Sequence, residues 1–367
     1  GTGFHLYEGQ PAAQTMLHTE FPSKDIYFTE GSVFGTTGAN MIISILRNWA
    51  RSYNAWVLML DQHRKPNNGP HNASRTCIEL MDDGSVVLVE IARGTLTRVT
   101  PDGAVEVVAE VGGGPNGAAL GPDGAVYLTN NGGCFDWQDV MGLTVPGPVP
   151  EGWTGGSIQR VDLASGEVTT VYTEASGRPL RAPNDLVFDE HGGFWFTDHG
   201  VRPERTSDRT GLHYASADGS RCEEVVHPLD APNGIGLSPD GTVLYAAETH
   251  TGRVWWWQVT GPGQVASTGA LHAGGQLLAG LPGVQMLDSL AVDAEGWVCV
   301  ATLGNGGITA ISPDGSQVDH VPLLDPLVTN ICFGGPDLRT AYVTLSGTGK
   351  LVAIDWPRPG LRLHHAR

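Results

Sequence analysis

Five polar side chains stand near the starts of successive apolar segments, and their chemical types suit metal binding. They are Asn116, Asn184, Asn233, Asp288 and Asn330, at intervals of 68, 49, 55 and 42 residues. Each apolar run is followed by a turn and then by a second β-rich run. Amide and carboxylate oxygens that converge on one point are the ligands that hard divalent cations prefer. The pattern predicts an oxygen-lined cation site if the fold brings these residues together.

The elements that must position these residues repeat at a spacing typical of a β-propeller. We expect an all-β fold, a six-bladed β-propeller whose innermost strands open with these residues, built from four-stranded antiparallel blades over residues 75–364. The units begin near Thr76, Gly114, Arg181, Ala231, Gln285 and Val328. In the last blade the strands are expected near 330–333, 341–345, 350–354 and 361–364. Residues 131–156 are expected to form a long loop over one face.

Composition favours one β-rich body and excludes several classes of partner. The 367 residues include 51 glycines and 24 prolines, as many tight turns require. No apolar stretch reaches the roughly 18 residues of a membrane span, so no membrane association is expected. The formal net charge of −18 repels polyanions and argues against nucleic acid. Five scattered cysteines without a Cys-x-x-Cys pair fit a reducing compartment, so we expect a cytoplasmic protein.

The first part of the chain does not follow the repeat. Met41–Trp49 has helix-like apolar spacing, and Lys65–Pro70 is rich in residues that break regular structure. Residues 1–75 are therefore expected to be an N-terminal extension or insertion, acting as a lid or as the contact of a homodimer. Residues 76–367 are expected to form the catalytic propeller.

Five longer phrases occur in the order in which one known family has them. They are Arg181-Ala-Pro-Asn-Asp-Leu-Val-Phe, Phe194-Trp-Phe-Thr-Asp-His-Gly, Pro232-Asn-Gly-Ile-Gly-Leu-Ser-Pro-Asp-Gly, Ala247-Glu-Thr-His-Thr-Gly-Arg-Val-Trp and Phe333-Gly-Gly-Pro-Asp-Leu-Arg-Thr-Ala-Tyr-Val-Thr. From about residue 75 onward the chain resembles the senescence marker protein/gluconolactonase/luciferin-regenerating enzyme family. The resemblance implies a six-bladed propeller with one catalytic divalent metal, usually calcium, at the top of the channel. Its members include gluconolactonases of regucalcin type, other lactonases and phosphotriesterases of diisopropyl fluorophosphatase type.

The resemblance also implies roles for individual residues. Asn233 and Asp288 match metal-ligand positions, and Asn184 matches a position that serves the metal in some relatives and the substrate in others. Arg181 would lie near the substrate oxygens, and Asn116 matches an axial Asn that we assign to substrate binding. The family usually has Asp-Gly where this chain has Asp288-Ser289, which leaves the carboxylate intact.

The first blade departs from the family pattern. The family opens this blade with Glu-Gly-Pro, whose Glu binds the metal, but the same register here falls near Thr76, and Glu79 would lie on the opposite strand face. A Glu-Gly-Ser-Val-Phe phrase occurs about 46 residues earlier, at Glu30. Either residues 36–75 are inserted into the first blade after Glu30, or the site lacks its usual Glu. We prefer Glu30 as the fourth ligand.

This donor set predicts a hydrolase. A cation held mainly by neutral amides keeps much of its charge and can polarise a carbonyl or phosphoryl oxygen and lower the pKa of bound water. Ca²⁺ suits flexible oxygen ligands better than Mg²⁺ does, with Zn²⁺ and Mn²⁺ as further alternatives. Asp288 is the expected catalytic residue, as proton acceptor or nucleophile. His199 follows a second blade strand and is a further candidate for contact with a small-molecule substrate.

Alternatives to a metal-dependent lactonase stay open at this point. A metal-dependent phosphotriesterase would use the same ligands. A non-catalytic propeller that serves as a binding scaffold would have no need for Asp288, Asn184 and Asn233 on its axis. A condensing propeller similar to strictosidine synthase would need a catalytic carboxylate but no metal. The chain has no Gly-x-Ser-x-Gly elbow, phosphate-binding loop or dinucleotide fingerprint, which argues against the common serine-hydrolase, nucleotide and redox classes.

Overall fold

The computed structural model describes residues 2–5, 12–23, 26–31, 50–55, 75–81, 84–140, 142–267 and 272–365. The chain divides into two compact units, Gly1–Asn68 and Gly69–Arg367. Each unit is described by itself. In the described part of the first unit, β1 (Thr2–His5), β2 (Ile26–Gly31) and β3 (Ala50–Ala55) form a parallel sheet in the order β1-β2-β3, and α1 spans Ala12–Glu20. No described helix is long and apolar enough to cross a membrane.

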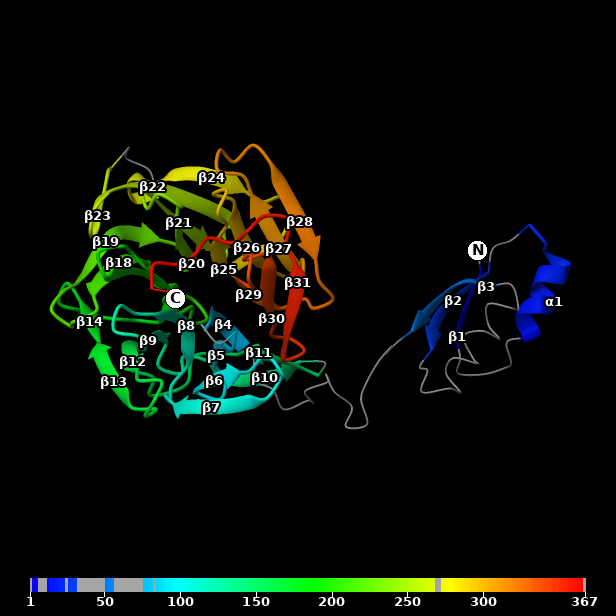
Figure 1. Ribbon diagram of the computed structural model, residues 1–367, viewed down its shortest axis with the longest axis horizontal. Helices are drawn as coiled ribbons and strands as arrows, with labels where there is room; N and C mark the ends of the chain where they lie inside the picture. Colours follow the sequence, from blue (N-terminus) through cyan, green and yellow to red (C-terminus); the bar gives the residue numbers. More distant parts are fainter. Residues whose placement is uncertain are drawn as a thin grey trace. The chain divides into compact units, whose positions relative to one another are not determined.

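The second unit is a six-bladed β-propeller (Figure 1). From the innermost strand outward, the first three blades are β4 (Arg75–Leu80), β5 (Val86–Glu90), β6 (Thr95–Val99) and β7 (Val105–Glu110); β8 (Pro115–Leu120), β9 (Val126–Asn130), β12 (Ser157–Val161) and β13 (Val168–Tyr172); and β16 (Pro183–Phe188), β17 (Gly193–Asp198), β18 (Thr210–Ser216) and β19 (Cys222–Leu229). Short hairpins in the connections are β10 (Trp137–Val140) with β11 (Leu143–Pro146), and β14 (Glu174–Ala175) with β15 (Arg178–Pro179).

The last three blades follow the same scheme. They are β20 (Pro232–Leu237), β21 (Val243–Glu248), β22 (Arg253–Gly261) and β24 (Gln276–Gly280); β25 (Met286–Val292), β26 (Val298–Leu303), β27 (Gly307–Ile311) and β28 (Val318–Pro322); and β29 (Val328–Gly334), β30 (Thr340–Leu345) and β31 (Lys350–Asp355). A short strand β23 (Gln264–Val265) pairs with the far end of β22, and η1 spans His272–Gly274. Every innermost strand contacts the next, and β29 contacts β4, so the ring is closed. The predicted fold class is confirmed.

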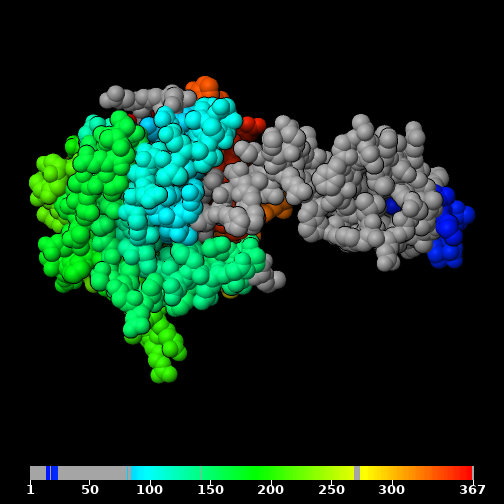
Figure 2. Space-filling model, turned by 90° about the horizontal axis from the view of Figure 1, so that it is seen from below, coloured from blue at the N-terminus to red at the C-terminus, as the bar shows by residue number. Residues whose placement is uncertain are grey.

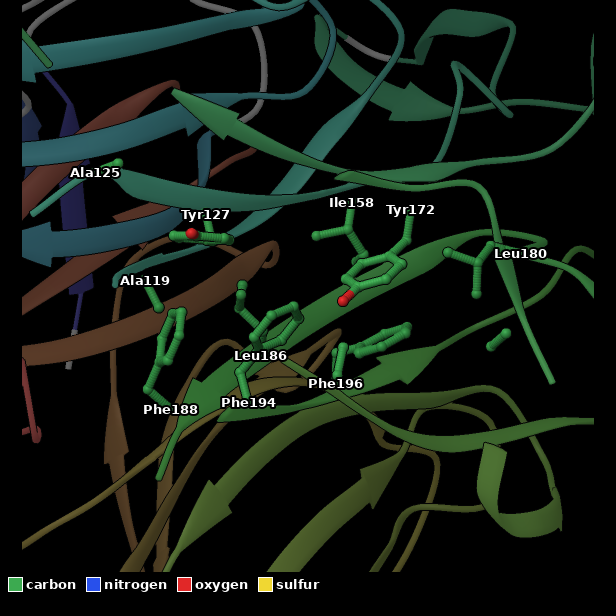
Figure 3. Packing of buried hydrophobic residues seen from close by; sticks show 12 residues of the cluster. Ala119, Ala125, Tyr127, Ile158, Tyr172, Leu180, Leu186, Phe188, Phe194 and Phe196 are labelled. Carbon is green, nitrogen blue, oxygen red and sulfur yellow. The ribbon is translucent and has the colours of Figure 1, made fainter. Parts of the chain in front are cut away.

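Aromatic side chains fill the space between neighbouring blades. Between blades 2 and 3, the ring centroids of Tyr127 and Phe188 lie 5.3 Å apart at 77°, and those of Phe188 and Phe194 lie 5.1 Å apart (Figure 3). Edge-to-face pairs of this kind add about 0.5–1.5 kcal/mol to the burial of their area. Successive side chains of a strand point to opposite faces of the blade. They therefore pack in different clusters, one on each side of the blade.

Trp255, Trp256 and Trp257 alternate between the two faces of β22. Trp255 and Trp257 are buried between blades 3 and 4, whereas Trp256 packs against the cluster between blades 4 and 5. These tryptophans therefore hold neighbouring blades together.

The predicted fourth strand of the last blade is wrong. Among the described residues this sheet has three strands, and residues 361–364 form none. The tail instead returns to blade 5, where Gly360 forms an isolated bridge with Asp293 and the backbone N of Leu361 donates to the Val292 carbonyl. It continues to blade 3, where His365 meets the Phe188 ring edge-on at 5.3 Å. The tail thus forms these hydrogen bonds with residues of another blade, and among the described residues it does not pair with β31 as a fourth strand.

An ion pair fixes this tail. The Arg358 guanidinium donates to the carboxylate of Asp293, whose side chain is fully buried, and stacks 4.1 Å from the centre of the Trp297 ring. Arg358→Ala would leave that carboxylate buried without its cation, which costs about 3–5 kcal/mol. We expect a loss of that size in the free energy of unfolding, measured by denaturant titration.

Arg160→Ala is the matched control. Arg160 pairs with Asp123 at 2.6 Å, but their side chains are 31% and 37% exposed. A pair of this kind contributes about 0–1 kcal/mol. Equal losses for the two variants would contradict the role given to the tail.

Candidate functional site

A β-bulge at the start of each innermost strand positions the candidate ligands. In blade 2, Pro115 pairs with Asn130 and Gly117 with Thr129, so Asn116 is the extra residue between two aligned pairs. The same shift follows Pro183 in β16, Pro232 in β20 and Leu287 in β25. Bulges of this kind re-aim side chains and are common beside active sites. They place Asn116, Asn184, Asn233 and Asp288 at equivalent points of four successive blades.

The strand register gives one bulge position in each of the six blades. It also corrects the position expected in the last blade. In blade 1 the extra residue is Thr76, where the resemblance would have had Glu. In blade 6 it is Thr329, because Val328 pairs with Leu345 and Asn330 with Thr344. Asn330 thus lies one residue beyond the position expected from the sequence. Its Oδ1 accepts a hydrogen bond from the backbone N of Ile331, 2.6 Å away.

The three predicted ligands on the propeller have the chemistry that a cation needs. Asn184, Asn233 and Asp288 are all buried, at 6%, 5% and 9% exposure. The Oδ1 atoms of both amides accept no hydrogen bond from any described residue. The Asn233 Nδ2 donates to Thr249 Oγ1 at 3.1 Å, which leaves its oxygen available. A buried polar atom without a partner costs about 1–3 kcal/mol, and coordination of a cation would remove that cost. The residues present therefore fit a hard cation.

The donor set differs from a transition-metal site. Within the part of the chain that the structure describes, no group of three His, Cys, Asp or Glu side chains is placed to hold a metal. The candidate centre is instead two amides with one carboxylate, the hard-oxygen chemistry that suits Ca²⁺.

Hydroxyl groups from the second strands fix the backbone of two ligands. Thr129 Oγ1 on β9 donates to the carbonyl of Asn184 in the next blade at 2.5 Å, and accepts from the backbone N of Gly117 in its own blade. Thr197 on β17 does the same with the Asn233 carbonyl, at 2.6 Å. Each hydroxyl joins two neighbouring blades at the level of the ligands, so the ligand positions depend on one another.

Side chains at the ends of the second strands hold the segments that lead into the ligands. Asp198 accepts hydrogen bonds from the backbone N atoms of Arg181 and Ala182, both at 2.7 Å. Glu248 accepts from the backbone N of Asp230 at 2.8 Å and from Trp255 Nε1 at 3.0 Å. Each carboxylate therefore holds the linker that leads into its own blade.

Asp185 is a residue of the site that the sequence analysis missed. Its buried carboxylate accepts hydrogen bonds from Leu186, from Ile235 in blade 4, and from Ser289 and Leu290 in blade 5. Burial raises its pKa to about 7. The available signal was Asn-Asp in the phrase from Arg181, where the phrases from Pro115 and Pro232 have Asn-Gly.

Asp288 lies close to this second carboxylate. Burial raises the pKa of Asp288 to about 7, hydrogen bonding from Asn233 opposes the increase, and the charge of Asp185 adds to it. Desolvation and a neighbouring like charge both disfavour ionisation. A cation between these strands would compensate both effects, which is a second reason why the donor set fits a metal.

The predicted substrate-binding residues lie at the same end of the propeller. Asn116 is buried at its register position. Arg181 precedes Asn184 by three residues, and its Nε lies 2.9 Å from Asp208 Oδ2. His199 follows β17, is partly buried, and meets the His250 ring edge-on at 5.8 Å. Burial lowers the pKa of His199, which favours a neutral imidazole.

Glu30 lies in β2 of the N-terminal unit, where its backbone pairs with that of His5. The three ligands on the propeller belong to the other compact unit. The role of Glu30 as a fourth ligand stays a prediction.

A cavity of about 510 Å³ lies in the channel, and Asp185 is one of the residues that line it. Its walls are mainly apolar side chains of the innermost strands, and the tail residues Leu361–His365 also line it. None of Asn184, Asn233 or Asp288 belongs to its lining, so the candidate centre is separate from this cavity.

The comparisons agree with the fold and with the motifs. A sequence profile of the SMP-30/Gluconolactonase/LRE-like region matches residues 76–347, and the chain belongs to this family. It is 27% identical over 280 residues to a gluconolactonase from Zymomonas mobilis, covering 68% of this chain and 70% of that protein. It is 28% identical over 180 residues to a 6-deoxy-6-sulfogluconolactonase from Pseudomonas putida, covering 48% and 59%.

Solved structures show the same fold. A gluconolactonase from Xanthomonas campestris superimposes with a TM-score of 0.60 at 20% identity, covering 78% of this chain and 88% of that one. A calcium-binding protein, regucalcin, from Agrobacterium tumefaciens superimposes with a TM-score of 0.58 at 18% identity, covering 79% and 98%.

Gly234 tests how tightly the blades meet at the site. A Cβ atom there would lie 2.5 Å from the backbone N of Leu290 and 2.8 Å from the carbonyl oxygen of Asp288. Gly234→Ala must therefore separate blades 4 and 5 beside two candidate ligands. We expect a loss of about 1–3 kcal/mol in stability. Calcium affinity, measured by calorimetry, should fall at least about tenfold, which corresponds to about 1.4 kcal/mol.

Gly236→Ala is the control in the same strand. Its new Cβ would meet only the side-chain atoms Leu290 Cδ1 and Val292 Cγ2, at 2.8 and 3.0 Å, which can move. Calcium affinity should stay close to that of the unmodified protein. A Gly234→Ala protein that binds calcium normally would show that the two strands do not set the ligand geometry.

Proposed function

We propose that the protein is a divalent-metal-dependent lactonase that opens a small oxygenated lactone. The observation that carries the proposal is the pair of buried amide oxygens, on Asn184 and Asn233, that lack donors among the described residues and lie in the two blades that precede the blade of the buried Asp288. A scaffold propeller would gain nothing from the cost of burying these groups.

The relatives support the type of reaction. Proteins named gluconolactonase, 6-deoxy-6-sulfogluconolactonase, lactonase and pentonolactonase align with this chain, which supports a lactonase-type hydrolase. The structural neighbour described as a calcium-binding regucalcin supports Ca²⁺ as the cation.

Asn184, Asn233 and Asp288 would hold the cation, with Glu30 as the proposed fourth ligand. A bound Ca²⁺ would supply Lewis-acid polarisation of the lactone carbonyl and stabilise the charge that develops on its oxygen. Asp288 is the proposed catalytic residue and accepts the proton of the attacking water. Its carboxylate is held in place by the Asn233 amide and by the backbone N of Ser289, which donates to Oδ1 at 3.0 Å.

The remaining residues would bind and orient the substrate. Arg181 and Asn116 donate hydrogen bonds to substrate oxygens, and the partly buried His199 contacts the substrate. Correct orientation matters because positioning alone can contribute several kcal/mol to the rate. The second strands provide this rigidity through Thr129 and Thr197.

Asp288→Asn tests the proposed base. The amide keeps an oxygen for the cation but removes the proton acceptor and one charge. Lactone hydrolysis should fall by about 10²–10⁴-fold, the usual contribution of a positioned acid or base. The melting temperature should change little, because only one side chain at the channel is altered. Near-normal turnover in this variant would remove Asp288 from the mechanism.

Asn116→Ala serves as the comparison at an equivalent register position. It should raise KM or weaken calcium binding while leaving kcat within about a factor of ten, since Asn116 moves no proton in the proposed reaction. Loss of kcat equal to that of Asp288→Asn would contradict the distinction between the two residues.

Removal of the metal tests the dependence itself. Dialysis against a calcium chelator should abolish hydrolysis of lactones, and added Ca²⁺ should restore it. Calorimetry on the chelated protein should detect one tight calcium site, absent in the double variant Asn184→Ala with Asn233→Ala. Full activity in chelator, or hydrolysis of phosphotriesters without hydrolysis of lactones, would overturn the proposal.

A further inference from the structure

The long connection within blade 2 is folded against the linker that leads into blade 3. It contains the β10–β11 hairpin, and its Trp153 packs with Cys134, Ala182 and Val201. In Figure 2 this connection is blue-green and gathers on one side of the propeller body, where a green loop projects beyond it. Trp153 Nε1 donates to the Asn131 carbonyl at 2.9 Å, which ties the two ends of the connection together.

Arg181 is held on three sides. Its backbone N is bound by Asp198 at 2.7 Å, and its Nε donates to Asp208 Oδ2 at 2.9 Å. The guanidinium carbon lies 4.6 Å from the centre of the Trp153 ring. The two terminal nitrogens donate no hydrogen bond to any residue that the structure describes, and the side chain is 40% exposed. The protein therefore fixes one edge and one face of the group and leaves the other edge open.

Asp208 is itself fixed. The same Oδ2 accepts from the backbone N of Val201 at 3.1 Å, and a Cβ on Gly200 would lie 2.7 Å from Asp208 Cβ. The loop thus folds back tightly at Gly200, whose φ of +67° suits glycine. Two separate segments, those of Trp153 and Asp208, meet at one guanidinium, and a third segment holds Asp208 itself.

We propose that Trp153 and Asp208 are positioning residues that hold Arg181 so that its terminal nitrogens bind an oxyanion substituent, such as a carboxylate, on the substrate. Guanidinium presents two parallel donors that match a carboxylate, and a fixed orientation reduces the entropy lost on binding. The inference rests on the proposed function, since it names the class of lactone that the site accepts. It adds Trp153 and Asp208, to which no role in the reaction has been assigned.

A purely structural role would give a different result. A partly exposed pair such as Arg181–Asp208 contributes about 0–1 kcal/mol to stability, so its loss should barely change the melting temperature. Positioning of Arg181 should appear instead in KM, and only for substrates whose oxyanion meets the guanidinium.

The experiment compares a neutral aldonolactone with an aldarolactone that carries a free carboxylate. In Trp153→Leu and Asp208→Asn, KM for the aldarolactone should rise about tenfold, which corresponds to about 1.4 kcal/mol. KM for the aldonolactone and kcat for both should stay within about twofold. Trp153→Phe keeps a ring face for the cation and should restore the lower KM. In an Arg181→Ala background, Trp153→Leu should have no further effect.

Trp137→Leu is the matched control, because Trp137 lies in the same connection but contacts Phe135. It should leave both KM values unchanged. Equal changes for the two lactones, or an effect that persists without Arg181, would overturn the inference. If the unmodified protein hydrolyses neither lactone, the proposed function fails. Calorimetry with the open aldarate then decides the inference, which requires weaker binding in Trp153→Leu than in Trp137→Leu.

Discussion

Close packing of the innermost strands is the constraint on which the rest of the site depends. At Gly234 the backbone of blade 5 occupies the space that a Cβ would need, only 2.5 Å away. Strands this close cannot shift without moving their neighbours. The bulge that displaces Asn233 is repeated at Asn184 and Asp288, the other two candidate ligands on the propeller. The ring is closed by contact of β29 with β4, and closure transmits the constraint to all six blades.

Several buried polar groups near the candidate ligands have hydrogen-bond partners in neighbouring strands or linkers. Thr129 and Thr197 satisfy ligand carbonyls, while Asp198 and Glu248 satisfy the backbone N atoms of the linkers. Against this background, two amide oxygens without donors form a local exception within the described residues. Unpaired buried groups are costly and persist where function requires them. Asn184 and Asn233 lie on adjacent blades, where one cation could satisfy both oxygens.

The sequence was sufficient to predict the repeat, the blade count and the residues that open most innermost strands, because turn chemistry and apolar alternation are local. The prediction failed where contacts between distant parts of the chain determine the structure. Residues 361–364 have a strand-like pattern, but Arg358 binds Asp293 of blade 5 and draws the tail away. Asn330 was misplaced by one residue because the bulge is visible only in the pairing register. Asp185 was missed because its partners come from two other blades.

The structure separates the groups that hold the propeller together from those that would recognise substrate. Tyr127 and Phe188, which pack between blades, belong to the strands β9 and β16 and not to the connections at the ligand end. Arg181 joins the two sets, because its backbone is held by Asp198 of a blade strand and its side chain by Trp153 and Asp208 of the connections. Connections tolerate change more readily than packed strands do. Substrate preference can therefore change through residues such as Trp153 while the ligand ring, which depends on strand packing, is retained.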